Sequence, residues 1–184
     1  REGRAPLPRA YDDEFFEELW TLLPHVERLQ FKGGEPFLAP ENHRIWDHLL
    51  AEGLRPEITV TTNGTIWSPR VEHYLRELRM GTIISIDGVD PSVQETIRVG
   101  TDAARVWANV DRFQAVAQEV GTPITLSICL MVETWREVGP LVAEADRRGA
   151  YANVIFVNQP WQHDLLRRPD AEVATAHAEM AATP

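Results

Sequence analysis

Strand-like and helix-like segments alternate along almost the whole 184-residue chain, and this alternation limits the fold more than any other feature of the sequence. The strand-like segments are rich in β-branched and apolar residues, and they cover 27–31, 58–62, 82–86, 124–130 and 153–157. The helix-like segments have apolar residues three and four positions apart, and they cover 12–23, 40–53, 68–81, 106–121, 135–148 and 171–182, with a short further piece at 91–97. Strands that are regularly followed by helices predict an α/β fold with a parallel sheet and helices packed outside it.

Residues that start or stop helices stand at the ends of these segments. Ser68-Pro69 combines an N-cap residue with proline at the first helical position. Gly53 and Gly149 stand where helices end, because glycine readily adopts the left-handed conformation of a C-terminal cap. No repeat or low-complexity run divides the sequence, so residues 1–184 are predicted to form one domain. The pattern by itself fits a complete barrel, a partial barrel or an open doubly wound sheet.

The charge balance and the scarcity of cysteine argue against several functions. A formal net charge of −10 argues against nucleic-acid binding, which needs clustered lysine and arginine to neutralise phosphates. No apolar run approaches the ~20 residues of a membrane span, so no membrane partner is expected. Cys129 is the single cysteine; it cannot form an intrachain disulfide or hold a metal by itself, and a reducing cytoplasmic location is the default. The six histidines show no convincing ligand spacing.

Glycine-rich and polar motifs follow the predicted strands at their carboxyl ends. In chain order they are Gly33-Gly34-Glu35-Pro36, Thr62-Asn63-Gly64, Ser85-Ile86-Asp87-Gly88 and Met131. The carboxyl ends of parallel strands meet at one edge of a sheet, so the motifs are expected to share the rim where α/β folds bind ligands. Adjacent glycines let a ligand approach the main chain, and a carboxylate beside them can accept from an ammonium group. Each motif alone also fits a bend, a turn or ordinary packing, so the ordered set carries the argument.

In this order and spacing the motifs resemble those of the radical S-adenosylmethionine (radical SAM) superfamily. Residues 31–36 are similar to its Gly-Gly-Glu-Pro motif, and Thr62-Asn63-Gly64 is similar to the motif on the next strand. Residues 85–88, followed by Ile97-Arg98, are similar to the strand and loop after that. The chain most resembles the branch whose barrel is followed by a SPASM or twitch domain, toward which the tail from residue 160 would lead. The resemblance implies a parallel, partial TIM-like (βα) barrel.

The resemblance also implies cofactors, a reaction and partners. Three cysteines spaced C-x3-C-x2-C would hold a 4Fe–4S cluster that binds S-adenosylmethionine. Reductive cleavage of S-adenosylmethionine would give a 5′-deoxyadenosyl radical that abstracts hydrogen from a substrate, for which a peptide is one candidate. An electron donor such as flavodoxin or ferredoxin would be a further partner.

Cofactor contacts are implied for individual residues of these motifs. The Gly34 carbonyl and Glu35 would hold the methionine ammonium group, and Arg98 would approach the carboxylate. Ser85 would contact the ribose or the carboxylate, and residues 130–132 would lie near the adenine. The complete set of cofactor-binding candidates is Gly33, Gly34, Glu35, Pro36, Thr62, Asn63, Ser85, Asp87, Arg98 and Met131. The alternatives are that Asp87 caps the following turn, that Arg98 is a solvated loop charge and that Met131 packs in the core.

The sequence departs from the family pattern in one major respect, because the cysteine triad is absent from residues 1–184. The predicted helix at 12–23 is similar to the helix that follows the cluster loop, so the first strand and that loop are expected to be missing, with the triad shortly before Arg1. The chain alone would then be inactive. A smaller departure is Thr134-Trp135 in place of Asn-Trp, which concerns local capping.

Two other functions compete with the enzyme interpretation. The first is a degenerate relative that lacks a cluster and only binds a peptide or a partner protein. The second is an unrelated βα-barrel hydrolase or lyase that uses Glu35 and Asp87 as acid and base. Barrels of this kind host many chemistries, so fold alone does not separate them.

Overall fold

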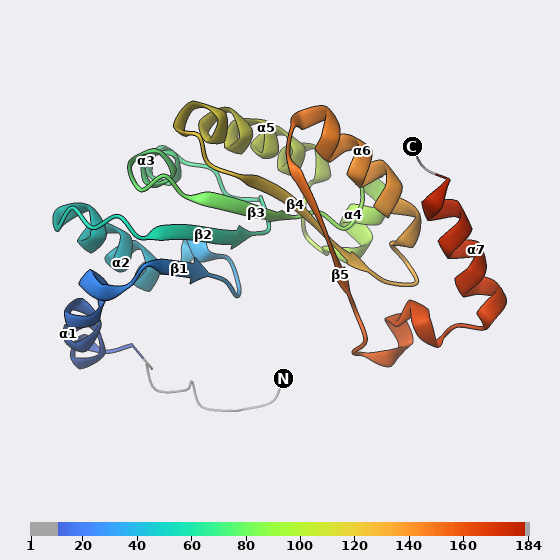
Figure 1. The fold of residues 1–184 in the computed structure, drawn as a ribbon, viewed down its shortest axis with the longest axis horizontal. Helices are drawn as coiled ribbons and strands as arrows, with labels where there is room; N and C mark the ends of the chain where they lie inside the picture. Colours follow the sequence, from blue (N-terminus) through green and yellow to red (C-terminus); the bar gives the residue numbers. More distant parts are fainter. Residues whose placement is uncertain (1–10, 183–184) are drawn as a thin grey trace.

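The computed structural model describes residues 11–182, and its centre is a five-stranded parallel sheet in the order β1-β2-β3-β4-β5 (Figure 1). The strands are β1 (Arg28–Phe31), β2 (Glu57–Thr62), β3 (Gly81–Ser85), β4 (Ile124–Leu130) and β5 (Tyr151–Phe156). Every pair of neighbours is parallel, and strands adjacent in sequence are adjacent in space. All five predicted strands are therefore confirmed, with ends that differ by at most two residues.

Seven α-helices lie within the described residues. They are α1 (Asp13–Leu22), α2 (Pro40–Ala51), α3 (Pro69–Glu77), α4 (Pro91–Ile97), α5 (Ala103–Val120), α6 (Val138–Arg148) and α7 (Asp170–Ala181). Ser68 caps α3 by accepting a hydrogen bond from the Val71 amide at 3.2 Å, as the sequence predicts. The helix predicted from residue 106 begins three residues earlier, because Asp102 caps it by accepting from the Arg105 amide at 3.0 Å.

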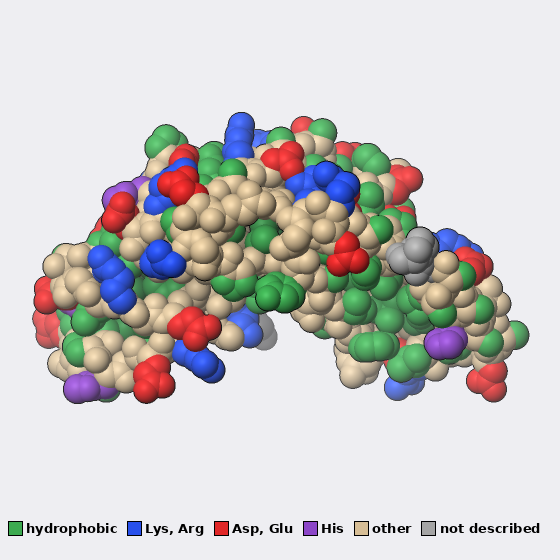
Figure 2. Space-filling view, turned by 45° about the horizontal axis from the view of Figure 1, so that its top comes forward, with side chains coloured by type: hydrophobic (Ala, Val, Ile, Leu, Met, Phe, Trp, Pro, Cys, Tyr) green, Lys and Arg blue, Asp and Glu red, His purple; other side chains and the backbone are tan. Residues whose placement is uncertain are grey.

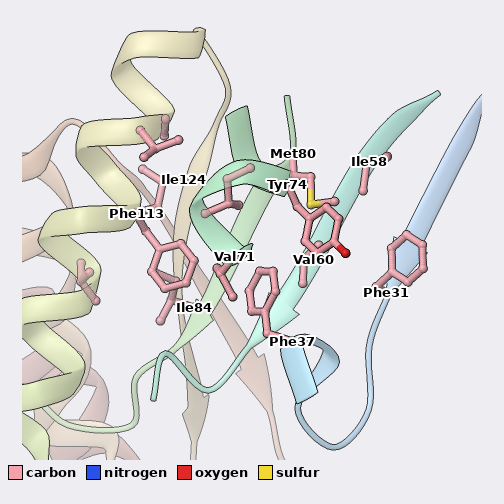
Figure 3. Close-up of a cluster of buried hydrophobic side chains, with 14 of the residues drawn as sticks. Phe31, Phe37, Ile58, Val60, Val71, Tyr74, Met80, Ile84, Phe113 and Ile124 are labelled. Carbon is pink, nitrogen blue, oxygen red and sulfur yellow. The ribbon is translucent and has the colours of Figure 1, made fainter. Parts of the chain in front are cut away.

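The main apolar core lies between one face of the sheet and the helices α2, α3, α5 and α6. Fully buried members include Trp46 from α2, Tyr74 from α3 and Phe113 from α5. Figure 3 shows Phe37 and Phe113 beside Val71 among the buried side chains of the core, and the two phenyl rings stack with centroids 5.9 Å apart. Because the core occupies one face and the strand order is sequential, the doubly wound alternative is wrong, and the fold is a partial TIM-like barrel.

The C-terminal part of the described chain forms a second, smaller core. Trp135 and Leu165 pack there with Leu130 and with Ala176 of α7. This cluster places α7 beside α6 at the far end of the sheet from α1 (Figure 1). None of the described helices is both long and apolar enough to cross a membrane.

Candidate functional site

The face of the sheet opposite the core carries uncharged polar side chains. In β2 to β4, the strand positions that point to the helices hold fully buried residues such as Val60, Ile84 and Leu126. Six uncharged polar residues at the alternate positions and at the paired positions of β1 and β5 form what we call the polar face: Gln30, Thr59, Thr61, Ser85, Ser127 and Asn153. The same side of the sheet also carries Ile83, Thr125, Cys129, Tyr151, Ile155 and the ion pair of Arg28 with Glu57. The molecule is indented between the lobe that contains α1 and the lobe that ends in α7 (Figure 2). The polar face is therefore the side on which a ligand can reach the sheet.

One row of the polar face runs across three strands. Ser85 is paired in register with Ser127, and Ser127 is paired with Asn153. The Asn153 side chain donates a hydrogen bond from Nδ2 to Ser127 Oγ at 3.1 Å. Sequence reasoning identified Ser85 but missed the other two residues. The available signal was the two-residue alternation of polar and apolar side chains within β4.

The loop after β1 contains Gly33 and Gly34, whose φ angles are +87° and +53°. Both glycines are exposed, and a Cβ atom added to either would meet no atom within 4 Å. The positive φ angles explain why glycine stands at these positions. The open space beside them leaves the main chain accessible, as the sequence predicts for a ligand-binding loop.

The Glu35 carboxylate connects this loop to the end of β2. Thr62 Oγ1 lies 2.8 Å from Oε1 and 2.9 Å from Oε2, so its hydroxyl hydrogen is shared between the two oxygens. The Asn63 amide donates to Oε2 at 2.9 Å, and the Phe37 amide donates to Oε1 at 3.3 Å, which caps the short 3-10 helix that begins at Pro36. The Glu35 carboxylate therefore has a structural role, because three donors from two loops converge on it.

The loop after β2 is also held on several sides. The Gly64 amide donates to Thr62 Oγ1 at 3.1 Å, and Asn109 of α5 donates from Nδ2 to the Gly64 carbonyl at 2.9 Å. Gly64 has a φ of +73°, and a Cβ there would lie 3.0 Å from Ile84 Cγ2 and 3.2 Å from Val106 Cγ1. Only glycine fits this contact without displacing a neighbour, so the second motif is rigidly packed against α5.

Asp87 and Arg98 form a largely buried ion pair at the end of β3. Arg98 NH2 lies 2.8 Å from Asp87 Oδ2, and the exposed fractions of the two side chains are 23% and 4%. The Cys129 amide donates to Asp87 Oδ1 at 2.8 Å, which connects the ends of β3 and β4. The alternative roles are therefore corrected: Asp90, and not Asp87, caps α4, and Arg98 is a paired, partly buried cation. Burial and the neighbouring Asp87 carboxylate raise the pKa of the Cys129 thiol.

Met131 follows β4 at the same end of the sheet and is partly buried. Its amide donates to Thr134 Oγ1 at 3.0 Å, and the Thr134 hydroxyl also donates to the Cys129 carbonyl. Thr134 stands at the N-cap of the 3-10 helix Trp135–Glu137, but its side chain makes no capping hydrogen bond to that helix and instead closes the turn after β4. The strand-end motifs share one rim, as predicted, while their part in binding a cofactor stays a prediction.

Between residues 11 and 182, no cluster of three or more histidine, cysteine, aspartate or glutamate side chains could hold a metal ion.

Comparisons with known proteins give a family match and several individual relatives. A family model described as the radical SAM superfamily matches residues 6–145. The chain is 27% identical to a GTP 3′,8-cyclase of Caulobacter vibrioides over 137 residues, which are 71% of this chain and 37% of the cyclase. It is 28% identical to the GTP 3′,8-cyclase of Crocosphaera subtropica over 122 residues, which are 62% and 36% of the two chains. The chain thus spans well under half the length of these curated relatives.

Solved structures show the same fold at low sequence identity. Streptococcus suis SuiB bound to S-adenosylmethionine superposes with a TM-score of 0.66 at 14% identity, over 96% of this chain and 40% of that chain. The protein anSMEcpe with bound AdoMet and the Cp18Cys peptide gives a TM-score of 0.61 at 16% identity, over 84% and 47% of the two chains.

Proposed function

The chain belongs to the radical SAM superfamily, and we propose that it forms the S-adenosylmethionine-binding core of a radical enzyme. When bound to a reduced 4Fe–4S cluster, S-adenosylmethionine supplies a 5′-deoxyadenosyl radical that takes a hydrogen atom from the substrate. The residues of this chain would bind the cofactor, orient it and keep water from the reacting atoms.

The observation that carries this proposal is the composition of the rim. It places open glycine main chain, the Ser85 hydroxyl and the Arg98 guanidinium at neighbouring strand ends. Arg98 is partly exposed, and its ion pair with Asp87 is made through NH2, so the exposed part of the guanidinium can still donate to a carboxylate. The Gly34 carbonyl is proposed to accept from the ammonium group, and the region of Met131 is proposed to lie near the adenine. These groups fit the polar parts of S-adenosylmethionine.

We propose that Glu35 binds the ammonium group in addition to its structural role of joining the loops after β1 and β2. A carboxylate can accept about four hydrogen bonds, and three donors already occupy this one. Capacity for one ammonium donor therefore remains, while Thr62 and Asn63 fix the direction in which it points. The remaining candidates Gly33, Pro36 and Asp87 would shape the site without direct charge contact.

The cluster itself does not fit residues 1–184, because their single cysteine cannot replace three thiolate ligands. We propose that the ligands come from residues encoded before Arg1, and that a SPASM or twitch region follows residue 184. A cytoplasmic enzyme with a flavodoxin-like or ferredoxin-like electron donor completes the proposal.

The occupied carboxylates disfavour the hydrolase or lyase alternative, since Asp87 is paired with Arg98 and Glu35 is held by amides.

A peptide is the substrate class that we propose, and the polar face supports it. None of its six side chains is charged, and their hydroxyl and amide groups match the hydrogen-bonding groups of a polypeptide. Arg28 lies on the same side of the sheet and is paired with Glu57, and Arg98, beyond the end of β3, is paired with Asp87. A nucleoside triphosphate such as GTP would need several available cations, so this face favours a substrate unlike that of the cyclase relatives.

Cluster loading tests whether the cysteine ligands of the cluster lie outside residues 1–184. After anaerobic treatment with iron and sulfide, residues 1–184 alone should retain much less than one cluster per chain. The product of the complete reading frame should hold at least four irons per chain, with any clusters of a SPASM or twitch region in addition. Iron and sulfide analysis measures both. A stoichiometric cluster on residues 1–184 alone would contradict the proposal, and a complete frame without three suitably spaced cysteines would favour the degenerate binding module.

A further inference from the structure

The loop of residues 87–90, directly after β3, has all four of its backbone amides bound by side-chain oxygens. The Asp87 and Gly88 amides donate to Gln94 Oε1 at 2.8 and 3.2 Å. The Val89 and Asp90 amides donate to Glu137 Oε2 at 2.7 and 2.9 Å. Backbone amides in loops usually bond to water or to other main chain, so this arrangement fixes the loop unusually firmly.

The two acceptors approach this loop from different parts of the chain. Gln94 lies on α4, has no exposed surface and is seven residues from Asp87. Glu137 ends the 3-10 helix Trp135–Glu137 after β4, 48 residues from Val89. Gly88 packs closely against α4, because a Cβ at this position would lie 2.9 Å from Val93 Cβ and from the Gln94 amide nitrogen. The loop is therefore held between two βα units.

The held loop determines the position of the ion pair. Asp87 is its first residue, and the Asp87 carboxylate is bound on one side by the Cys129 amide and on the other by Arg98. Both acceptors thus act on the main chain that carries Asp87, and Asp87 in turn orients the guanidinium. We infer that Glu137 and Gln94 are positioning residues that hold Asp87 and Arg98 in the geometry required for the carboxylate of S-adenosylmethionine. This inference rests on the proposed function.

The test compares two ligands that differ in that carboxylate. S-adenosylmethionine and its decarboxylated analogue are titrated calorimetrically into the cluster-loaded product of the complete reading frame. The variant Glu137→Gln should bind S-adenosylmethionine about tenfold more weakly, which corresponds to one impaired charge-assisted contact. Its affinity for the decarboxylated analogue should stay within about twofold. Arg98→Ala should show the same selectivity, and adding Glu137→Gln to it should cause no further loss.

The matched control is Glu133→Gln, which removes a carboxylate from the same segment that pairs with His163 instead of with the loop. It should change neither affinity. If Glu137→Gln does not fold, Gln94→Met removes the other acceptor with an apolar side chain of similar size and should give the same selective loss.

The possible failures are distinguishable. Equal weakening of both ligands, or no weakening of either, would overturn the inference even if Arg98→Ala behaves as expected. If the unsubstituted holoprotein binds no S-adenosylmethionine, the proposed function fails together with the inference.

Discussion

Replacing Glu35 with alanine should lower the free energy of unfolding by about 2–4 kcal/mol, because three donors lose a charged acceptor in a partly buried position. The Asn63 amide and the Thr62 hydroxyl would have to find water, and the loops after β1 and β2 would lose their direct connection. Urea denaturation measures the change. In the cluster-loaded protein, the same variant should also bind S-adenosylmethionine about one to two decades more weakly.

Glu77→Ala is the matched control, since Glu77 is an exposed glutamate at the last residue of α3. A surface substitution of this kind is expected to change stability by no more than about 0.5 kcal/mol. Equal changes for the two variants would show that the contacts of Glu35 contribute nothing to the fold.

The second large effect is expected at Asp87. Asp87→Ala leaves the Arg98 guanidinium, whose side chain is 23% exposed, without its carboxylate, and it leaves the Cys129 amide without an acceptor. Breaking a buried pair by removing one partner typically costs 3–5 kcal/mol, and the partial exposure of Arg98 reduces our expectation to about 2–4 kcal/mol. Chemical denaturation again provides the measurement.

The chain offers a closely matched ion pair for comparison. Arg28 and Glu57 also lie 2.8 Å apart, but their side chains are 80% and 67% exposed. Glu57→Ala should therefore cost only about 0–1 kcal/mol. If Glu57→Ala destabilised the protein as much as Asp87→Ala, burial would not be the source of the difference.

The fold was predictable from the sequence because its signals are local. Runs of β-branched or other apolar residues marked the five strands, and caps such as Ser68 and Gly149 marked helix ends. The start of α5 was misplaced because the apolar stripe begins at Val106, whereas Asp102 sets the true boundary through its side chain. Choosing between a partial barrel and a doubly wound sheet required the strand order, which no local pattern contains.

The order of the motifs was enough to predict that they share one rim of the sheet, but not the contacts between them. Gly33, Gly34 and Gly64 do occupy positive-φ positions, and the strand-end motifs do share one rim. The contacts within the rim were not predictable, because they join residues far apart in sequence: Glu35 with Thr62, and Glu137 with Val89. A side chain that binds distant main chain leaves no periodic signal, so its role emerges only from the three-dimensional arrangement.

The most direct test of the central claim is the fate of S-adenosylmethionine itself. The product of the complete reading frame is loaded with its cluster, reduced anaerobically and incubated with S-adenosylmethionine, and the products are separated by liquid chromatography. A radical SAM enzyme that consumes its cofactor is expected to release 5′-deoxyadenosine and methionine, and one that regenerates it is expected to exchange label from a substrate into the 5′ position of S-adenosylmethionine. S-adenosylmethionine that is both uncleaved and free of exchanged label after incubation with a fully loaded and reduced cluster, with and without labelled candidate peptides, would contradict the account.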